Sequence, residues 1–108
     1  MISNTKKTGD RADIRTDLAL CYLRTGDKEK ASQQIELAYN ELESVFDEIN
    51  TVHKYIWQTK ILMFRGLINY NLDKKDEAKE DFKLALQIAS KHDLKMRLQA
   101  VEELLELD

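Results

Sequence analysis

The chain has 108 residues, with 17 basic and 20 acidic side chains and no proline. That length supports one domain with a single packed core. Three glycines and no proline are too few turn-forming residues for an all-β sandwich or barrel. Hydrophobic residues make up 43% and charged residues 34% of the chain, which is typical of a folded protein, and we expect a helical one.

The charge pattern and the cysteine count exclude further classes. The net charge is −3 and the lysines are interspersed with acids, so no basic stripe is present for a nucleic acid. Cys21 is the only cysteine, which excludes an intramolecular disulfide and fits a reducing compartment. Residues 1–10 have no apolar signal core, and no apolar run is long enough to span a bilayer. We therefore expect a cytoplasmic protein without direct nucleic-acid or membrane binding.

The first predicted helix follows a polar segment. Residues 1–10 are aperiodic, and we expect a flexible tail there. Apolar residues follow helical spacing over 11–25, with Asp10 as the expected N-cap. Gly26 should end this helix, because glycine adopts the left-handed conformation without a Cβ clash.

Four more helices are predicted along the rest of the chain. Asp27 should cap the second helix and Asp93 the fifth. The third is apolar over much of its circumference, so neighbours should enclose it. The expected boundaries are about 28–49, 52–72, 75–90 and 93–107.

The chain contains an internal repeat. When the sequence is shifted by 47 residues, small and apolar positions coincide. Small residues at matching positions allow the two helices of a hairpin to approach closely. The coinciding pairs are Ala19 with Gly66, Leu20 with Leu67, Ala31 with Ala78, Ile35 with Phe82, Leu37 with Leu84 and Ala38 with Ala85.

These positions resemble the tetratricopeptide repeat. The first unit carries Leu18, Ala19, Tyr22, Gly26, Asp27, Ala31, Ile35 and Ala38; the second carries Arg65, Gly66, Tyr70, Leu72, Ala78, Asp81, Phe82, Ala85 and Leu86. The resemblance implies an all-α solenoid of two helical hairpins, over about 11–50 and 52–90, within a single domain over 11–108. A last helix at about 93–107 would be a cap or a partial repeat. The period is 47 residues rather than about 34, and we place the additional residues in the second and third helices.

The resemblance also implies a binding face. The first helix of each unit would line a concave groove for a peptide or a partner helix. Apolar residues at such spacing also pack against neighbouring helices, so both roles stay open for them. The candidate contact residues are Thr16, Leu20, Leu23, Arg24, Met63, Leu67, Tyr70 and Asn71.

No motif for catalysis, metal binding or a cofactor is present. Cys21, His53 and His92 lie on separate helices or turns, without the close spacing of metal ligands. We expect Cys21 to be a buried structural thiol and the histidines to lie near helix ends. Tyr55 and Trp57 should pack on Phe46 and Ile49; if exposed instead, they would form a patch for self-association.

We therefore expect a non-enzymatic scaffold or adaptor that binds a protein or peptide and carries no cofactor. The alternative is a peptide-sensing fragment of a bacterial transcriptional regulator whose DNA-binding domain lies outside this chain. Long-helix repeats of this kind resemble the repeat domains of such regulators. Few repeats also suggest a homo-oligomer or a part of a longer repeat array.

Overall fold

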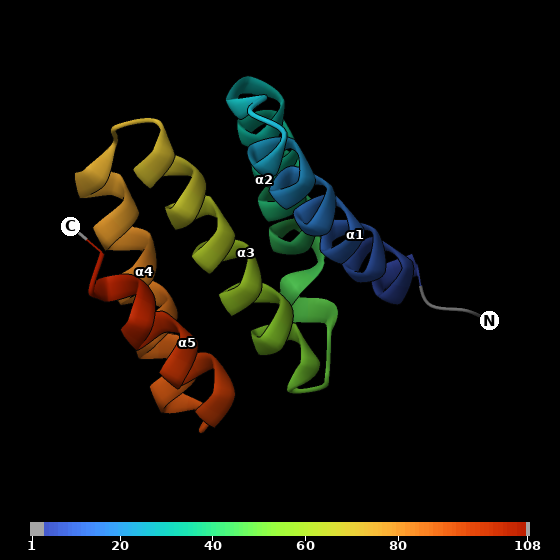
Figure 1. Cartoon of the computed structure of the whole chain (residues 1–108). Coiled ribbons are helices and arrows are strands. Elements are labelled where there is room, and N and C mark those ends of the chain that lie inside the picture. The colour runs from blue at the N-terminus through green and yellow to red at the C-terminus, as the bar shows by residue number, and fades with distance from the viewer. Residues whose placement is uncertain (1–3, 108) are drawn as a thin grey trace.

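The computed structural model describes residues 4–107, which form helices joined by short connections (Figure 1). No strand occurs within these residues, and the all-α prediction is confirmed. The α-helices are α1 (Asn4–Arg24), α2 (Lys28–Val45), α3 (His53–Asn71), α4 (Lys75–Lys91) and α5 (Lys95–Leu105), and a 3-10 turn, η1 (Phe46–Glu48), follows α2.

The helices pair into two hairpins. Helix α1 packs on α2, and α3 packs on α4. Helix α3 also contacts α1, α2 and α5, so it is enclosed as its apolar sequence predicts. Figure 1 shows the α1–α2 hairpin at one end of the molecule and α5, packed on α4, at the other.

The helices of each hairpin approach each other at the small residues of the repeat. Ala19 and Ala31 are fully buried in the first hairpin. In the second hairpin, Gly66 lies under the ring of Phe82, and a Cβ atom at Gly66 would be only 2.5 Å from Cε1 of Phe82. The matching positions therefore have the same role in both hairpins, as the repeat predicts.

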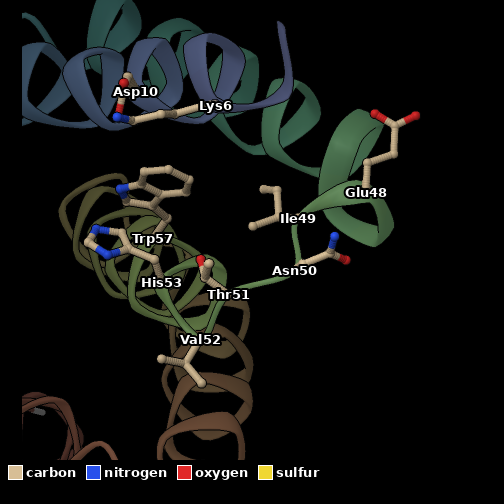
Figure 2. Close-up of a pocket in the computed structure, with 9 residues that line it drawn as sticks. All are labelled: Lys6, Asp10, Glu48, Ile49, Asn50, Thr51, Val52, His53 and Trp57. Atoms are coloured by element: carbon tan, nitrogen blue, oxygen red, sulfur yellow. The ribbon is translucent and has the colours of Figure 1, made fainter. Parts of the chain in front are cut away.

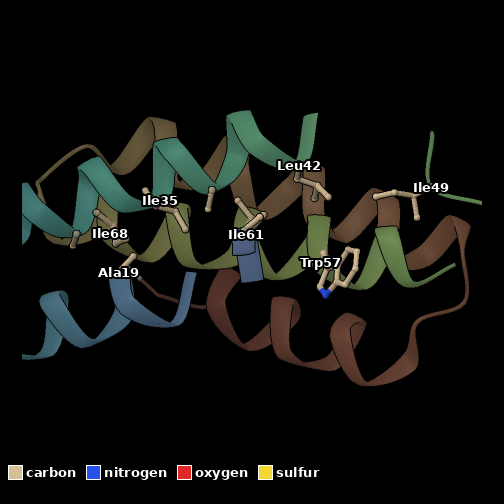
Figure 3. Close-up of a cluster of buried hydrophobic side chains, with 10 residues drawn as sticks. Ala19, Ile35, Leu42, Ile49, Trp57, Ile61 and Ile68 are labelled. Atoms are coloured by element: carbon tan, nitrogen blue, oxygen red, sulfur yellow. The ribbon is translucent and has the colours of Figure 1, made fainter. Parts of the chain in front are cut away.

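Two clusters of buried side chains form the core. The first joins α1, α2 and α3 and extends to Ile49 and Trp57 (Figure 3). Its buried members are Ala12, Ala19, Ala31, Ile35, Ala38, Leu42, Ile49, Trp57, Ile61 and Ile68. The second joins α3, α4 and α5 and contains Leu62, Met63, Ala78, Phe82, Ala85 and Val101.

Left-handed residues follow three of the helices. Gly26 has φ of +88°, which confirms its predicted role as a helix stop. Asp73 has φ of 62° and Asp93 has φ of 56°, and short aspartates tolerate this conformation better than most residues. Asp27 caps α2 as predicted, because its carboxylate accepts a hydrogen bond from Lys30 N at 3.1 Å. The prediction that Asp93 caps α5 is wrong, because Leu94 directly precedes that helix.

Helix α1 begins at Asn4, well before the expected cap at Asp10. The prediction of a flexible tail is therefore wrong for residues 4–10, and residues 1–3 lie outside the described part. The cause is tertiary packing. Gly9 lies against the indole of Trp57, where a Cβ atom would be 2.3 Å from Cζ3. Burial of this turn on the core stabilises helix that the local sequence does not favour.

Helix α2 ends at Val45, whereas a helix to residue 49 was expected. The backbone leaves the helical conformation at Val45, with φ of −122° and ψ of 5°, and η1 follows. Beyond that turn, Ile49 reaches the core beside Trp57 and is only 8% exposed. Part of the additional length of the repeat is thus a turn and a linker rather than helix.

Candidate protein-binding face

The structure divides the predicted contact residues by their exposure. Thr16 is fully buried and its hydroxyl donates to Ala12 O at 2.8 Å. Met63 is 7% exposed and belongs to the second core cluster. Both therefore stabilise the fold and offer no surface to a partner, which corrects the prediction for these two residues.

The other six predicted residues reach the surface to different degrees. Leu23 packs against the first core cluster and Tyr70 against the second, so both are half-buried. Leu20 and Leu67 are half-buried and belong to neither core cluster, while Arg24 and Asn71 are exposed. The binding role of these residues stays a prediction.

Leu20, Arg24, Leu67 and Asn71 belong to one larger surface. Each helix contributes residues at successive spacings of four, three and four, which places them on one side of that helix. The residues from α1 are Asp13, Asp17, Leu20 and Arg24, and those from α3 are Lys60, Phe64, Leu67 and Asn71. We call these eight residues the α1–α3 face.

Lys60 joins the two halves of the α1–α3 face. Its Nζ lies 2.9 Å from Oδ1 of Asp13 and 2.9 Å from Oδ1 of Asp17. Partial burial by itself lowers the pKa of Lys60, but its hydrogen bonds to the two aspartates and their charges outweigh burial and raise it. The ammonium is therefore held in its charged form and fixes α1 beside α3.

Apolar and amide groups continue the α1–α3 face. The ring of Phe64 lies next to Lys60, whose Nζ is 5.9 Å from the ring centroid. One turn further, the Asn71 side-chain amide donates to Leu67 O at 2.8 Å, which fixes its orientation. Its Oδ1 remains an acceptor suited to a backbone N–H of a bound peptide.

Sequence reasoning missed Asp13, Asp17, Lys60 and Phe64. A signal was available, because Asp13 and Lys60 are 47 residues apart and have opposite charges at equivalent repeat positions. Equivalent positions on neighbouring first helices lie close together in a stack of hairpins, so this pair could have been predicted. The pairing of Lys60 with Asp17 could be found only from the structure, because these two residues are not at equivalent repeat positions.

The thiol of Cys21 is exposed, so the prediction of a buried structural cysteine is wrong. Cys21 lies on the side of α1 that faces away from the core. Its equivalent one repeat later, Ile68, is 1% exposed because it has a hairpin to pack on. Helical spacing places Cys21 in line with apolar residues and so predicted its burial. Within residues 4–107, however, no hairpin packs on that side of α1.

The aromatic residues near the start of α3 pack as predicted. The rings of Phe46 and Tyr55 meet edge to face with centroids 5.7 Å apart. Trp57 is 8% exposed and shares the first core cluster with Ile49. The alternative of an exposed aromatic patch for self-association at Tyr55 and Trp57 is therefore not realised.

A pocket of about 640 Å³ opens beside Trp57, where α1, the linker after η1 and α3 meet (Figure 2). Ile49 and Trp57 form its apolar wall, and Lys6 and Asp10 of α1 lie across from them (Figure 2). Its size is in the range of small-molecule pockets, but both charge signs line it and neither predominates. The lining residues are Lys6, Asp10, Glu48, Ile49, Asn50, Thr51, Val52, His53 and Trp57.

The histidines lie at helix ends, as predicted. His53 begins α3, and its ring and that of Trp57 meet edge to face with centroids 4.8 Å apart. His92 follows α4 and stacks on Tyr55 with centroids 3.5 Å apart. Among residues 4–107, no three side chains of the metal-binding types form a cluster. Nor is any helix in this part of the chain both long and apolar enough to cross a membrane.

One comparison with known proteins gives a match. The sequence profile of the tetratricopeptide repeat matches residues 12–40 and 59–92, more than half of the chain. These stretches contain all eight residues of the α1–α3 face, whereas every residue that lines the pocket beside Trp57 lies outside them. No curated protein and no solved structure shows significant similarity to the chain. Tetratricopeptide repeats generally mediate protein–protein interaction, and the family is typically non-enzymatic.

Proposed function

Because this chain belongs to the tetratricopeptide repeat family, we propose that it is a non-enzymatic adaptor that binds a segment of another protein on the α1–α3 face. The observation that carries the proposal is the bridge from Lys60 to Asp13 and Asp17. It holds the first helices of both hairpins side by side, so that their exposed groups present one preorganised surface.

The chemistry of this surface suits an extended peptide segment with apolar side chains. Leu20, Phe64 and Leu67 supply half-buried apolar contacts. Asn71 supplies an acceptor for the peptide backbone, and Arg24 a cation at the end of α1. A bound segment would be held by apolar burial and oriented by these two polar groups.

Comparative co-purification tests this assignment. Immobilised wild-type chain and an Arg24→Glu/Asn71→Ala variant are incubated with the same lysate, and bound proteins are quantified by mass spectrometry. Both substituted residues are exposed, so the fold should be retained. We expect the variant to lose partners that the wild type retains.

A control variant separates this surface from the rest of the molecule. Leu37 is 46% exposed on α2 and does not belong to the α1–α3 face. Leu37→Ala should bind every partner of the wild type. Equal recovery of all partners by Arg24→Glu/Asn71→Ala would show that binding occurs elsewhere.

The finer alternative, a peptide-sensing part of a bacterial regulator, makes a different prediction. Residues 41–58 lengthen the repeat and are not matched by the family profile. This additional length favours the alternative, because the repeat domains of such regulators resemble long-helix repeats. A sensor should bind short free peptides with the same dependence on Arg24 and Asn71, whereas an adaptor should require its larger partner. Titration with peptides cut from recovered partners distinguishes the two. A cytoplasmic location stays part of the proposal, supported by the single cysteine.

A further inference from the structure

Helix α1 carries a second exposed surface, on the side away from the core. Ile14 is 66% exposed, Leu18 is 39% exposed, and Cys21 is exposed as well. Their spacing of four and then three residues places them in one line along the helix, in the manner of the apolar seam of a coiled coil. We call these three residues the α1 seam.

The equivalent residues of the second hairpin are covered by helices. Ile61 and Ile68, each 47 residues after a member of the α1 seam, are 1% exposed and pack in the first core cluster. Arg65, equivalent to Leu18, lies over the ring of Tyr39 on α2 at 4.2 Å. This position in the fold is therefore a helix-packing face, and on α1 it has apolar side chains but no helix from residues 4–107 over it.

The two flanks of the α1 seam carry opposite charge. On the side toward α2, Arg11 and Arg15 share one carboxylate, that of Glu41, so this flank keeps a net positive charge. On the side toward α3, Lys60 pairs with two acids, Asp13 and Asp17. Exposed Asp10 adds a third acid there, so this flank is net negative beside Ile14 and Leu18. Lys6 and Arg24 lie on the same side of α1 but nearer to its two ends.

We propose that the α1 seam binds the α1 seam of a second copy of this chain, with the two helices parallel about a two-fold axis. In that arrangement the positive flank of each copy lies beside the negative flank of the other. An antiparallel pair would instead place like flanks together, at a cost from repulsion. The charge pattern thus favours a second copy of the chain as the occupant and sets its direction.

The parallel arrangement places the two Cys21 side chains opposite each other. Each residue of a seam that lies on a two-fold axis parallel to the helix meets its own counterpart. In an antiparallel pair centred between Ile14 and Leu18, Cys21 would instead lie opposite Arg11. Cross-linking by a short bismaleimide therefore reports the direction of the pairing.

Sedimentation velocity of the full chain over a range of concentrations tests the proposal. We expect a concentration-dependent dimer, and a dissociation constant raised about 30-fold or more by Leu18→Asp, as for a central interface residue. Ile14→Asp should also raise the dissociation constant. Because Ile14 and Leu18 are both exposed, circular dichroism should show an unchanged fold in each variant. The short bismaleimide should link wild-type dimers through Cys21.

Leu37→Asp is the matched control. Leu84 is the equivalent of Leu37 in the second hairpin, and it is 42% exposed although α3 and α5 both pack on α4. The position of Leu37 therefore lies outside the helix-packing face. The control should dimerise like the wild type. A wild type that remains monomeric at about 0.5 mM, or a dimer insensitive to Leu18→Asp, would overturn the proposal. A dimer that the bismaleimide does not link would overturn the parallel arrangement.

Discussion

Arg65 on α3 donates two hydrogen bonds to the carboxylate of Asp81 on α4. Its Nε lies 3.1 Å from Oδ2 and its Nη2 lies 2.9 Å from Oδ1 of Asp81, which is 7% exposed. The same guanidinium lies over the Tyr39 ring and 3.8 Å from Glu36, both on α2. Burial by itself lowers the pKa of Arg65, but Asp81, with Glu36 and Tyr39, outweighs burial and raises it. One charged side chain thus joins the two hairpins.

Replacement of Arg65 by methionine should lower the free energy of unfolding by about 3 kcal/mol, because it leaves the buried Asp81 carboxylate without its cation. The double variant Arg65→Met/Asp81→Leu should recover part of that loss, since it removes both charges. Urea denaturation of each variant measures the values. Arg24→Met is the control, as Arg24 is exposed and should change stability little. A loss at Arg65→Met no larger than that of the control would contradict the assignment.

Gly66→Ala should destabilise the second hairpin. A Cβ atom at this position would lie 2.5 Å from Cε1 and 2.8 Å from Cδ1 of Phe82, so helix α3 and the ring must move apart. We expect a loss of about 1–3 kcal/mol, measured by thermal and urea denaturation. Phe82→Leu in the Gly66→Ala background should cost less than Phe82→Leu alone, because the smaller side chain removes the clash. Additive losses in the two variants would show that the contact is not the cause.

The three left-handed residues should respond differently to glycine and alanine. Gly26→Ala should lower stability by about 1 kcal/mol, because the φ of +88° is unfavourable for alanine although no atom lies near. Asp73→Gly and Asp93→Gly should leave stability unchanged or raise it by up to about 1 kcal/mol. Asp76→Gly, in the first turn of α4, is the control and should be destabilising. A loss at Asp73→Gly as large as at Asp76→Gly would refute the interpretation.

The bridge at Lys60 predicts a loss of stability at alkaline pH. A pKa that is raised in the folded state means that the contribution of Lys60 is complete below its unfolded pKa of about 10.4 and disappears as the pH rises through the folded pKa. The difference in unfolding free energy between wild type and Lys60→Met should therefore be constant near neutral pH and shrink above about pH 10.

Chemical denaturation of both proteins over this pH range measures that difference. Lys74→Met, at an exposed lysine outside the α1–α3 face, is the control for general alkaline effects. A difference that stays constant through the titration would mean that the charge of Lys60 contributes nothing to the packing of α1 on α3.

The sequence predicted most of the helix ends that are decided by residues at the helix end itself. Gly26 ends α1 and Asp27 caps α2 because backbone conformation and a side-chain hydrogen bond decide both. The start of α1 was mispredicted, since packing of Gly9 on the distant Trp57 decides it. Of the predicted contact residues, Leu20, Arg24, Leu67 and Asn71 reach the surface and their binding role stays a prediction, whereas Thr16 and Met63 are buried.

The sequence by itself determined the repeat. Small residues that recur after 47 positions specify where helices cross, because close approach of two backbones is a local requirement at each crossing. Only the tertiary structure decided which apolar positions are covered. Cys21 and Ile68 occupy equivalent positions in α1 and α3, yet within residues 4–107 only Ile68 has a neighbouring hairpin to pack on. Burial depends on which helix lies opposite, and periodicity along one helix holds no information about that neighbour.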